Sequence, residues 1–265
     1  MESDMPLILA AAGRGSRLGE LTSVLPKSLL PEPVFGKAIL HHIYERLEKE
    51  TNIQQIIIVG ENDSNAAEQI LKFTQEFPFC CPPEIEIVKG ERRGVGYAFF
   101  LGAERLKEIG LADAIMSVAD SIAATYSNLI HNQSAVVVGV TRPDPRSEKA
   151  FTSIQVNAAG IITKDPQVVE KDASKIARGI YNFNNGLLSE YCQIFKHGMT
   201  YRTNDSNVIN AKAEFKVTWI WRQMQECGIE IAAGDLVDLV ELNVPKDFDR
   251  FRDFFSQNNK HDLMR

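Results

Sequence analysis

The stretch between residues 7 and 30, LILAAAGRGSRLGELTSVLPKSLL, most constrains what this chain can fold into. Its apolar start, residues 7–10, is typical of a buried strand, and Gly13 and Gly15 predict a turn after it. Glycines lack the Cβ atoms that keep a ligand away from the main chain, and successive N–H groups in such a turn bind anions. The stretch therefore predicts a phosphate-binding loop, although a purely structural turn explains the two glycines alone equally well.

Three cations accompany this loop. Arg14 and Arg17 flank it, and Lys27 follows ten residues later. Guanidinium groups bind phosphate oxygens in pairs, and a lysine supplies a compact point charge. We predict that they converge on one polyanion; the alternative for each is a solvated surface cation. The sequence after Gly13, Arg-Gly-Ser-Arg, fits neither a Walker loop, which ends in Gly-Lys-Ser/Thr, nor the dinucleotide-binding fingerprint.

Short apolar strands alternate with helical patterns through the first half of the chain. The strands are expected at 56–59, 85–88, 114–118 and 135–140, and the helices at 37–48, 66–73 and 97–106. This alternation predicts a parallel sheet covered on both faces. Ligands of such sheets gather at the carboxyl ends of the strands, where Gly13, Asp120 and residues 89–96 are expected.

The pattern changes after residue 141. Polar strands are expected at 151–156 and 161–162 around a turn, followed by a return strand at 179–183. A helix at 213–227, a strand at 240–243 and a helix opened by Pro245 complete the chain. We predict one domain over residues 1–256, with an insertion and return strand at about 141–185, and a polar tail at 257–265.

Composition excludes several classes of protein. The formal net charge of −6 disfavours a nucleic-acid partner, which would need a basic face. No apolar run could span a bilayer, and residues 1–6 lack the features of a signal peptide, so we expect no membrane partner and a cytoplasmic location. The four cysteines show no zinc-binding spacing and are expected to be reduced thiols.

The opening stretch as a whole resembles the signature of the sugar-phosphate nucleotidyltransferases, which include glucose-1-phosphate thymidylyltransferases. The shared motifs are L-A-A-G-x-G-x-R-L, then P-K-x-L at 26–29 and G-K-x-x-L at 36–40. The resemblance implies a three-layer α/β/α fold with a Rossmann-like, mixed but mostly parallel sheet. This sheet would be of the glycosyltransferase-A-like type, with an inserted acceptor-side hairpin.

The same resemblance assigns the nucleotide side of the site. Arg17 and Lys27 become catalytic residues: Arg17 orients the leaving pyrophosphate, and Lys27 bridges the attacking and attacked phosphates. The expected nucleotide contacts are Leu9, Ala10, Ala11, Gly13, Arg14, Gly15, Ser16, Lys89 and Gly94. Lys89 stands where relatives read the base, often with Gln or Glu, but an ammonium group only donates hydrogen bonds.

A magnesium site is implied by two further positions. Asp120 follows the strand at 114–118 where the family has a metal-binding Gly-Asp, with Ala119 in place of the glycine. Asn243 matches the second ligand, an Asp or Asn before the last helix. Mg²⁺ uses few protein oxygens and keeps several waters. Each residue could instead cap a helix.

The acceptor side resembles the family's V-E-K-P and G-x-Y motifs. The corresponding residues are Glu170 and Lys171, with Asp172 replacing the proline, and Gly179 and Tyr181. The aromatic-Gly-Val that backs the hexose in relatives reads Phe-Thr-Ser at 151–153, so Thr152 adds bulk where a sugar would rest.

The resemblance implies an enzyme that joins a nucleoside triphosphate and a sugar 1-phosphate into an NDP-sugar, with release of pyrophosphate. One alternative is transfer to a non-sugar or cyclitol phosphate, as in cytidylyltransferases. A third reading is a catalytically silent nucleotide-binding subunit. The sequence leaves the nucleobase, the acceptor and the oligomeric state open, a homo-oligomer included.

Overall fold

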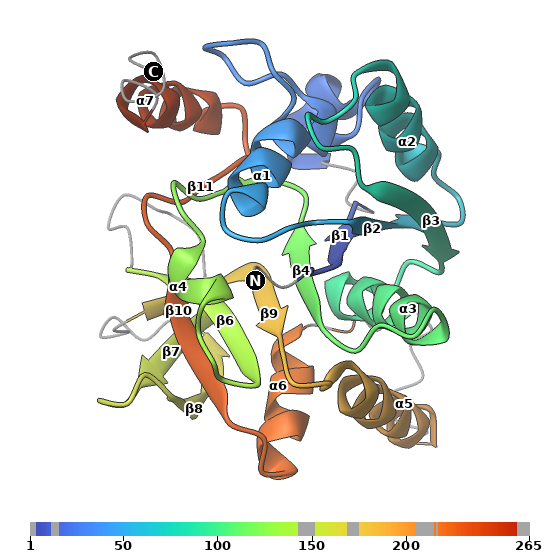
Figure 1. Ribbon diagram of the computed structural model, residues 1–265, viewed down its shortest axis with the longest axis vertical. Helices are drawn as coiled ribbons and strands as arrows, with labels where there is room; N and C mark the ends of the chain where they lie inside the picture. Colours follow the sequence, from blue (N-terminus) through green and yellow to red (C-terminus); the bar gives the residue numbers. More distant parts are fainter. Residues whose placement is uncertain are drawn as a thin grey trace.

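A mixed nine-stranded sheet forms the centre of the protein (Figure 1). The computed structural model describes residues 4–11, 16–142, 152–168, 175–204, 215 and 217–258. The main path of the sheet runs in the order β10 (Ile231–Asp235), β6 (Val136–Thr141), β9 (Lys175–Phe183), β4 (Ala114–Val118), β1 (Leu7–Ala10), β2 (Gln55–Glu61) and β3 (Glu84–Gly90). A hairpin of β7 (Thr152–Val156) and β8 (Ile162–Val168) joins it through β9, and β5 (Ser121–Ile122) pairs separately with β11 (Val240–Glu241).

Most pairs in the main path are parallel. Strand β1 runs parallel to β2 and β4, β2 to β3, and β6 to β10. Strand β9 alone on this path is antiparallel, to both β4 and β6. Together with the covering helices this confirms the predicted three-layer α/β/α class with a mixed, mostly parallel sheet.

Helices cover both faces of the sheet. On one face lie α1 (Ile39–Glu48), α2 (Ala66–Glu76), α4 (Ser127–Ile130) and α7 (Asp247–Asn258); on the other lie α3 (Val95–Glu108), α5 (Leu188–Asn204) and α6 (Val217–Glu226) (Figure 1). Alternate residues of each strand feed the two layers, so that Leu7 and Leu9 join the first core and Ile8 joins the second. The alternation explains why the strands are apolar without interruption.

Several predicted elements are confirmed closely. Strand β4 has the predicted bounds, and the predicted inward stripe of α1, at Ile39, Ile43 and Leu47, is fully buried. The predictions missed α5 and β10 altogether, and the helix predicted from residue 213 is described from Val217. Helix α7 extends to Asn258 and so includes two residues of the predicted tail.

The glycine at position 179 is required by close packing between β9 and β4. A Cβ atom there would lie 2.4 Å from Cγ2 of Val118, and a valine side chain has little rotamer freedom to move away. We therefore expect Gly179→Ala to lower the free energy of unfolding by about 1–3 kcal/mol in urea titrations. In the double variant with Val118→Ala the penalty from Gly179→Ala should largely disappear; an unchanged penalty would show that crowding is not its cause.

The contact between α1 and α7 makes stability sensitive to acid through His42. Burial, reinforced by the charges of Lys37 and Arg46, lowers the pKa of this histidine to about 3, and its ring centroid lies 4.3 Å from that of Phe255. The carboxylate of Glu32, 3.6 Å away, is engaged by backbone N–H groups of the following loop. His42 is therefore neutral in the folded chain and accepts a proton below about pH 6.5 once the chain unfolds.

Because the unfolded state binds the extra proton, the His42 contribution lowers stability as pH falls below about 6.5, by roughly 1.4 kcal/mol per pH unit. Urea titrations between pH 7.5 and 5.0 should show this loss of unfolding free energy. In His42→Leu the loss should be smaller by the amount that His42 contributes. The exposed His131 offers a control, His131→Leu. If the free energy of unfolding fell equally steeply with pH in wild type and His42→Leu, the prediction would be wrong.

Candidate active site

A lysine and an aspartate from distant parts of the sequence meet at one edge of the sheet. Lys27 begins the 3₁₀ turn η2 (Lys27–Leu29), after η1 (Ser16–Thr22), and Asp120 follows β4. Because β1 and β4 are parallel, with Ala10 opposite Val118, both strands end at the same edge. The Nζ atom of Lys27 donates to Oδ2 of Asp120, and their side chains are only 14% and 26% exposed. The structure thus brings two of the predicted site residues into direct contact.

Asn243 is brought beside Asp120 by the small sheet. The N–H of Leu242 donates to the carbonyl of Asp120 at 3.0 Å, which continues the pairing of β11 with β5. The N–H of Asn243 donates at 2.7 Å to Oδ2 of Asp247, at the start of α7. Asn243 thus follows directly after the main-chain contact with Asp120, and its own N–H is anchored at the start of α7.

Two residues that the sequence analysis did not select hold the Asn243 amide. Its Nδ2 donates to Oε2 of Glu241 at 3.2 Å, and the same oxygen lies 3.3 Å from Nη1 of Arg178. Arg178, only 7% exposed, also donates from Nε to Oγ1 of Thr141 at 2.8 Å. A carboxylate accepts hydrogen bonds, so Glu241 faces the NH₂ group of Asn243. The amide oxygen of Asn243 therefore points away from Glu241.

A cavity of about 200 Å³ opens beside the carboxyl ends of β1 and β2. Its walls come from Ala10, Val59, Gly60, Glu61, Glu91, Arg92, Arg93, Gly94, Val95, Ala98 and Leu101. It therefore joins Ala10 and Gly94, which the sequence predicts as nucleotide contacts. Gly94, with φ at 85°, adopts a conformation that favours glycine, immediately before α3.

Lys89, the predicted base contact, is not among the residues that line this cavity. Its ammonium group pairs with Glu68 of α2 and donates to the carbonyl of Ser64 at 3.2 Å. Glu61, at the end of β2, lines the cavity instead. No local pattern distinguishes Glu61 from an exposed strand-end carboxylate, so its burial could be found only from the structure.

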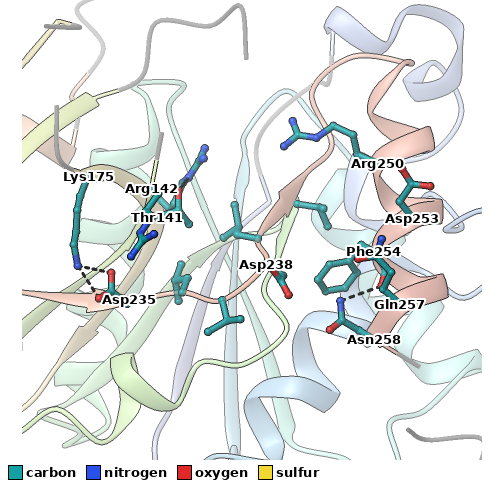
Figure 2. A pocket seen from close by; sticks show the side chains of 15 residues that line it. Thr141, Arg142, Lys175, Asp235, Asp238, Arg250, Asp253, Phe254, Gln257 and Asn258 are labelled. Carbon is teal, nitrogen blue, oxygen red and sulfur yellow. Dashed lines mark hydrogen bonds and ion pairs between the residues drawn. The ribbon is translucent and has the colours of Figure 1, made fainter. Parts of the chain in front are cut away.

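A larger cavity of about 900 Å³ separates α7 from the ends of β6, β9 and β10 (Figure 2). Basic and acidic side chains line it together: Arg142, Lys175, Arg178 and Arg250 with Asp235, Asp238 and Asp253. Lys175 pairs with Asp235 across its left side in Figure 2, at 2.5 and 2.6 Å. Lys175 and Arg178 of β9 line this cavity, whereas the predicted acceptor contacts Gly179 and Tyr181 do not.

Comparison with known proteins decides the family. The profile of the Nucleotidyl transferase family matches residues 5–214. The chain belongs to this family. The assignment agrees with the strand, glycine-rich loop and Pro-Lys motif from which the resemblance was inferred.

Proteins similar to this chain have low sequence identity to it. Bifunctional protein GlmU of Methylococcus capsulatus is 24% identical over 239 residues, which is 90% of this chain and 46% of that protein, so the chain spans less than half of its relative. An inositol-1-phosphate CTP transferase from T. maritima superposes with a TM-score of 0.69 at 15% identity, covering 97% and 99% of the two chains. A putative glucose-1-phosphate thymidylyltransferase from Bacillus anthracis superposes with a TM-score of 0.69 at 18% identity, and the match covers 96% of each chain.

Two of the predicted acceptor contacts, Gly179 and Tyr181, lie in packed parts of the sheet. Tyr181 is 5% exposed and packs edge-on against Phe99 and Trp221, where burial raises the pKa of its hydroxyl group. Gly179 faces Val118. In this structure both residues therefore serve packing, and their contact with an acceptor stays a prediction.

Part of the predicted site lies outside the described residues. These are Gly13, Arg14, Gly15, Glu170 and Lys171, together with the side chains of Ser16 and Arg17.

Leu9 and Ala11 are buried, and the N–H of Ala11 donates to the carbonyl of Val59 at 3.1 Å, so they hold the end of β1 against β2.

The donors beside Lys27 suit a hard cation. Asp120 offers a carboxylate and Asn243 an amide oxygen, and Mg²⁺ accepts one or two such ligands while it keeps waters and phosphate oxygens. Within the described residues no group of three or more His, Cys, Asp or Glu is arranged to hold a metal ion. None of the helices described has the length and apolar character of a membrane span.

Proposed function

We propose that this nucleotidyltransferase uses a nucleoside triphosphate and a sugar 1-phosphate to form an NDP-sugar and pyrophosphate. The contact between Lys27 and Asp120 is the observation that carries the proposal, because it places a cation and a candidate metal ligand at one sheet edge. The smaller cavity lies at the same edge and is lined by Ala10, the last residue of β1.

The reaction brings two anions together. An oxygen of the acceptor phosphate forms a bond to the α-phosphorus, and the bond from that phosphorus to the bridging oxygen of pyrophosphate breaks, with its electron pair leaving on pyrophosphate. Lys27, freed from Asp120, neutralises the attacking and attacked phosphates, and Arg17 orients the leaving group.

A divalent cation would be held by Asp120 and Asn243 in this proposal. When bound, Mg²⁺ supplies positive charge to the phosphate oxygens. Glu241 accepts the amide NH₂ of Asn243 and so keeps the amide oxygen available. Arg178 neutralises Glu241, so that the carboxylate adds no unopposed charge to the site.

The acceptor is proposed to be hydroxylated, because Glu170 and Lys171 keep the residue types that bind a sugar and its phosphate in the family. Thr152 favours a second candidate, transfer to a non-sugar or cyclitol phosphate, since it replaces the glycine behind the hexose. The two candidates share the nucleotidyl-transfer chemistry and differ only in the acceptor.

Pyrophosphate release tests the proposal directly. Purified protein with Mg²⁺ is incubated with each common nucleoside triphosphate against hexose 1-phosphates, inositol phosphate and phosphocholine. Release with a hexose 1-phosphate supports the first candidate, and release only with the other acceptors supports the second. Nucleotide binding without release from any pair would overturn both and favour a silent subunit.

A further inference from the structure

Two of the four cysteines are neighbours in the sequence and share one exposed loop. Cys80 and Cys81 lie between α2 and β3 and both are exposed, as is Cys227, whereas Cys192 is buried. Burial raises the pKa of the Cys192 thiol, because it disfavours the thiolate that reacts. The thiols that small molecules in solution can reach are therefore the neighbouring pair and the single thiol of Cys227.

The loop that carries the pair is fastened to α1 before and after the two thiols. Before them, Nε2 of His41 donates to the carbonyl of Phe77 at 2.9 Å. The buried ring of Phe79 stacks on that of Tyr44, with the ring centroids 4.1 Å apart. At the other end, the Tyr44 hydroxyl donates to the carbonyl of Cys81. These contacts hold the main chain of the loop against the helix, while both thiol side chains stay in solvent.

We propose that Cys80 and Cys81 form a modification site, at which a small-molecule disulfide such as oxidised glutathione produces a disulfide between the two neighbours. The thiolate of one cysteine attacks a sulfur of oxidised glutathione, which releases one glutathione and leaves the other bound to the protein. The neighbouring thiolate then attacks the cysteine sulfur of this mixed disulfide and releases the second glutathione. Two protein thiols are oxidised, one small-molecule disulfide is reduced, and the two thiol protons end on the two glutathiones.

A disulfide between sequence neighbours is easy to reduce. Consecutive Cα atoms are about 3.8 Å apart across a trans peptide, which is shorter than the roughly 4.4–6.8 Å that disulfides usually span. The main chain must therefore twist when the ring closes, and the contacts of Phe79 and Cys81 with α1 oppose that movement. Strained and exposed disulfides are the labile ones. We therefore expect a reversible modification and no permanent cross-link.

The position of the loop separates this modification from the candidate active site. The loop ends at the first residue of β3, Glu84, which pairs with Gln55 at the start of the parallel strand β2. The candidate active site lies where the parallel strands end, at the opposite edge of the sheet. The proposal therefore does not depend on the reaction that the protein catalyses.

Cys227 provides the comparison with a single exposed thiol. It follows α6, and the residues on either side of it are Glu226 and Gly228. A mixed disulfide with glutathione at Cys227 has no neighbouring cysteine in the sequence to release the glutathione, so it should persist. One reagent should therefore give two products: the pair loses two hydrogen atoms, and Cys227 gains one glutathione.

Peptide mass analysis of the folded full-length chain after incubation with oxidised glutathione tests the proposal. The peptide that contains both neighbours should lose two hydrogen atoms in at least about half of the chains, and an excess of reduced glutathione should restore the thiols in at least about nine tenths of them. Cys80→Ser and Cys81→Ser should each keep glutathione on the remaining thiol, because the second attacking thiolate is gone. Cys227→Ser is the matched control and should leave oxidation of the pair unchanged.

Three results would overturn the proposal. The first is glutathione that stays on Cys80 or Cys81 in the wild-type chain, because it would show that the neighbouring thiolate does not complete the exchange. The second is a covalent dimer linked through these residues. The third is a pair that stays reduced while Cys227 is modified. A disulfide that resists reduced glutathione would contradict the expected reversibility. None of these results bears on pyrophosphate release, so the proposed function is tested separately.

Discussion

Lys27→Ala is expected to lower kcat/KM for pyrophosphate release by at least about a hundredfold. The loss follows from the removal of a fixed cation from a site where negative charge gathers during the reaction, and single preorganised groups of this kind contribute about 10²–10³-fold. Steady-state rates with the best nucleotide and acceptor pair measure it, and the far-UV circular dichroism spectrum checks the fold.

Lys37→Ala is the matched control for this variant. Lys37 pairs with Glu45 as Lys27 pairs with Asp120, but its side chain is 37% exposed and it lines neither of the two described cavities. A surface pair contributes little, so near-normal turnover is expected. Near-normal turnover in Lys27→Ala as well would remove Lys27 from the mechanism.

Asp120→Ala is expected to have an effect of the same size, at least about a hundredfold on turnover. Here the cause is the loss of the carboxylate that balances Lys27 and that we propose as a metal ligand. A second readout separates these roles: the Mg²⁺ concentration for half-maximal rate should rise in Asp120→Asn, which keeps the side-chain shape.

Asp249→Asn controls for the removal of a carboxylate, because Asp249 is 74% exposed on α7 and pairs with Arg252 on the same helix at 3.0 Å. It should leave both the rate and the Mg²⁺ requirement unchanged. If Asp120→Asn retained the wild-type Mg²⁺ requirement while losing activity, Asp120 would be a partner of Lys27 and no metal ligand.

The sequence predicted those elements whose signal is local. Ile39, Ile43 and Leu47 recur at helical spacing, and all three are fully buried in α1. Strand β10 lacks such a signal because it reads Ile-Ala-Ala-Gly-Asp, and small residues have low strand propensity. Its glycine is needed where it is: a Cβ at Gly234 would lie 2.9 Å from the carbonyl oxygen of Asn128. Tertiary packing makes this segment a strand.

Helix α5 was missed for a related reason. Gly198 weakens its local helical pattern. The structure requires that glycine, since a Cβ there would lie 2.1 Å from Cη2 of Trp219 in α6. The contact joins two helices that are far enough apart in the sequence for no local pattern to include both. The sequence therefore could not show why a glycine belongs inside this helix.

The residues of the candidate site also fall into two groups, those that a local motif indicates and those that only the structure reveals. Lys27 was selected from its Pro-Lys motif and Asp120 from its place after a strand, and the two side chains meet at the edge where β1 and β4 end. Glu61 and Arg178 could not be selected, because their importance depends on burial and on partners far away in sequence. A charged residue in a strand gives no sign that it will be buried.

The antiparallel direction of β9 has a consequence for how the family could diversify. Thr141, at the end of β6, lies opposite Ile176 near the start of β9, so the chain between them departs from and returns to the same sheet edge. That excursion needs no crossover, and within it β7 pairs with the start of β9 through Ser153 and Ile154. Such a segment can differ in length among members of the family while the order of the sheet is kept.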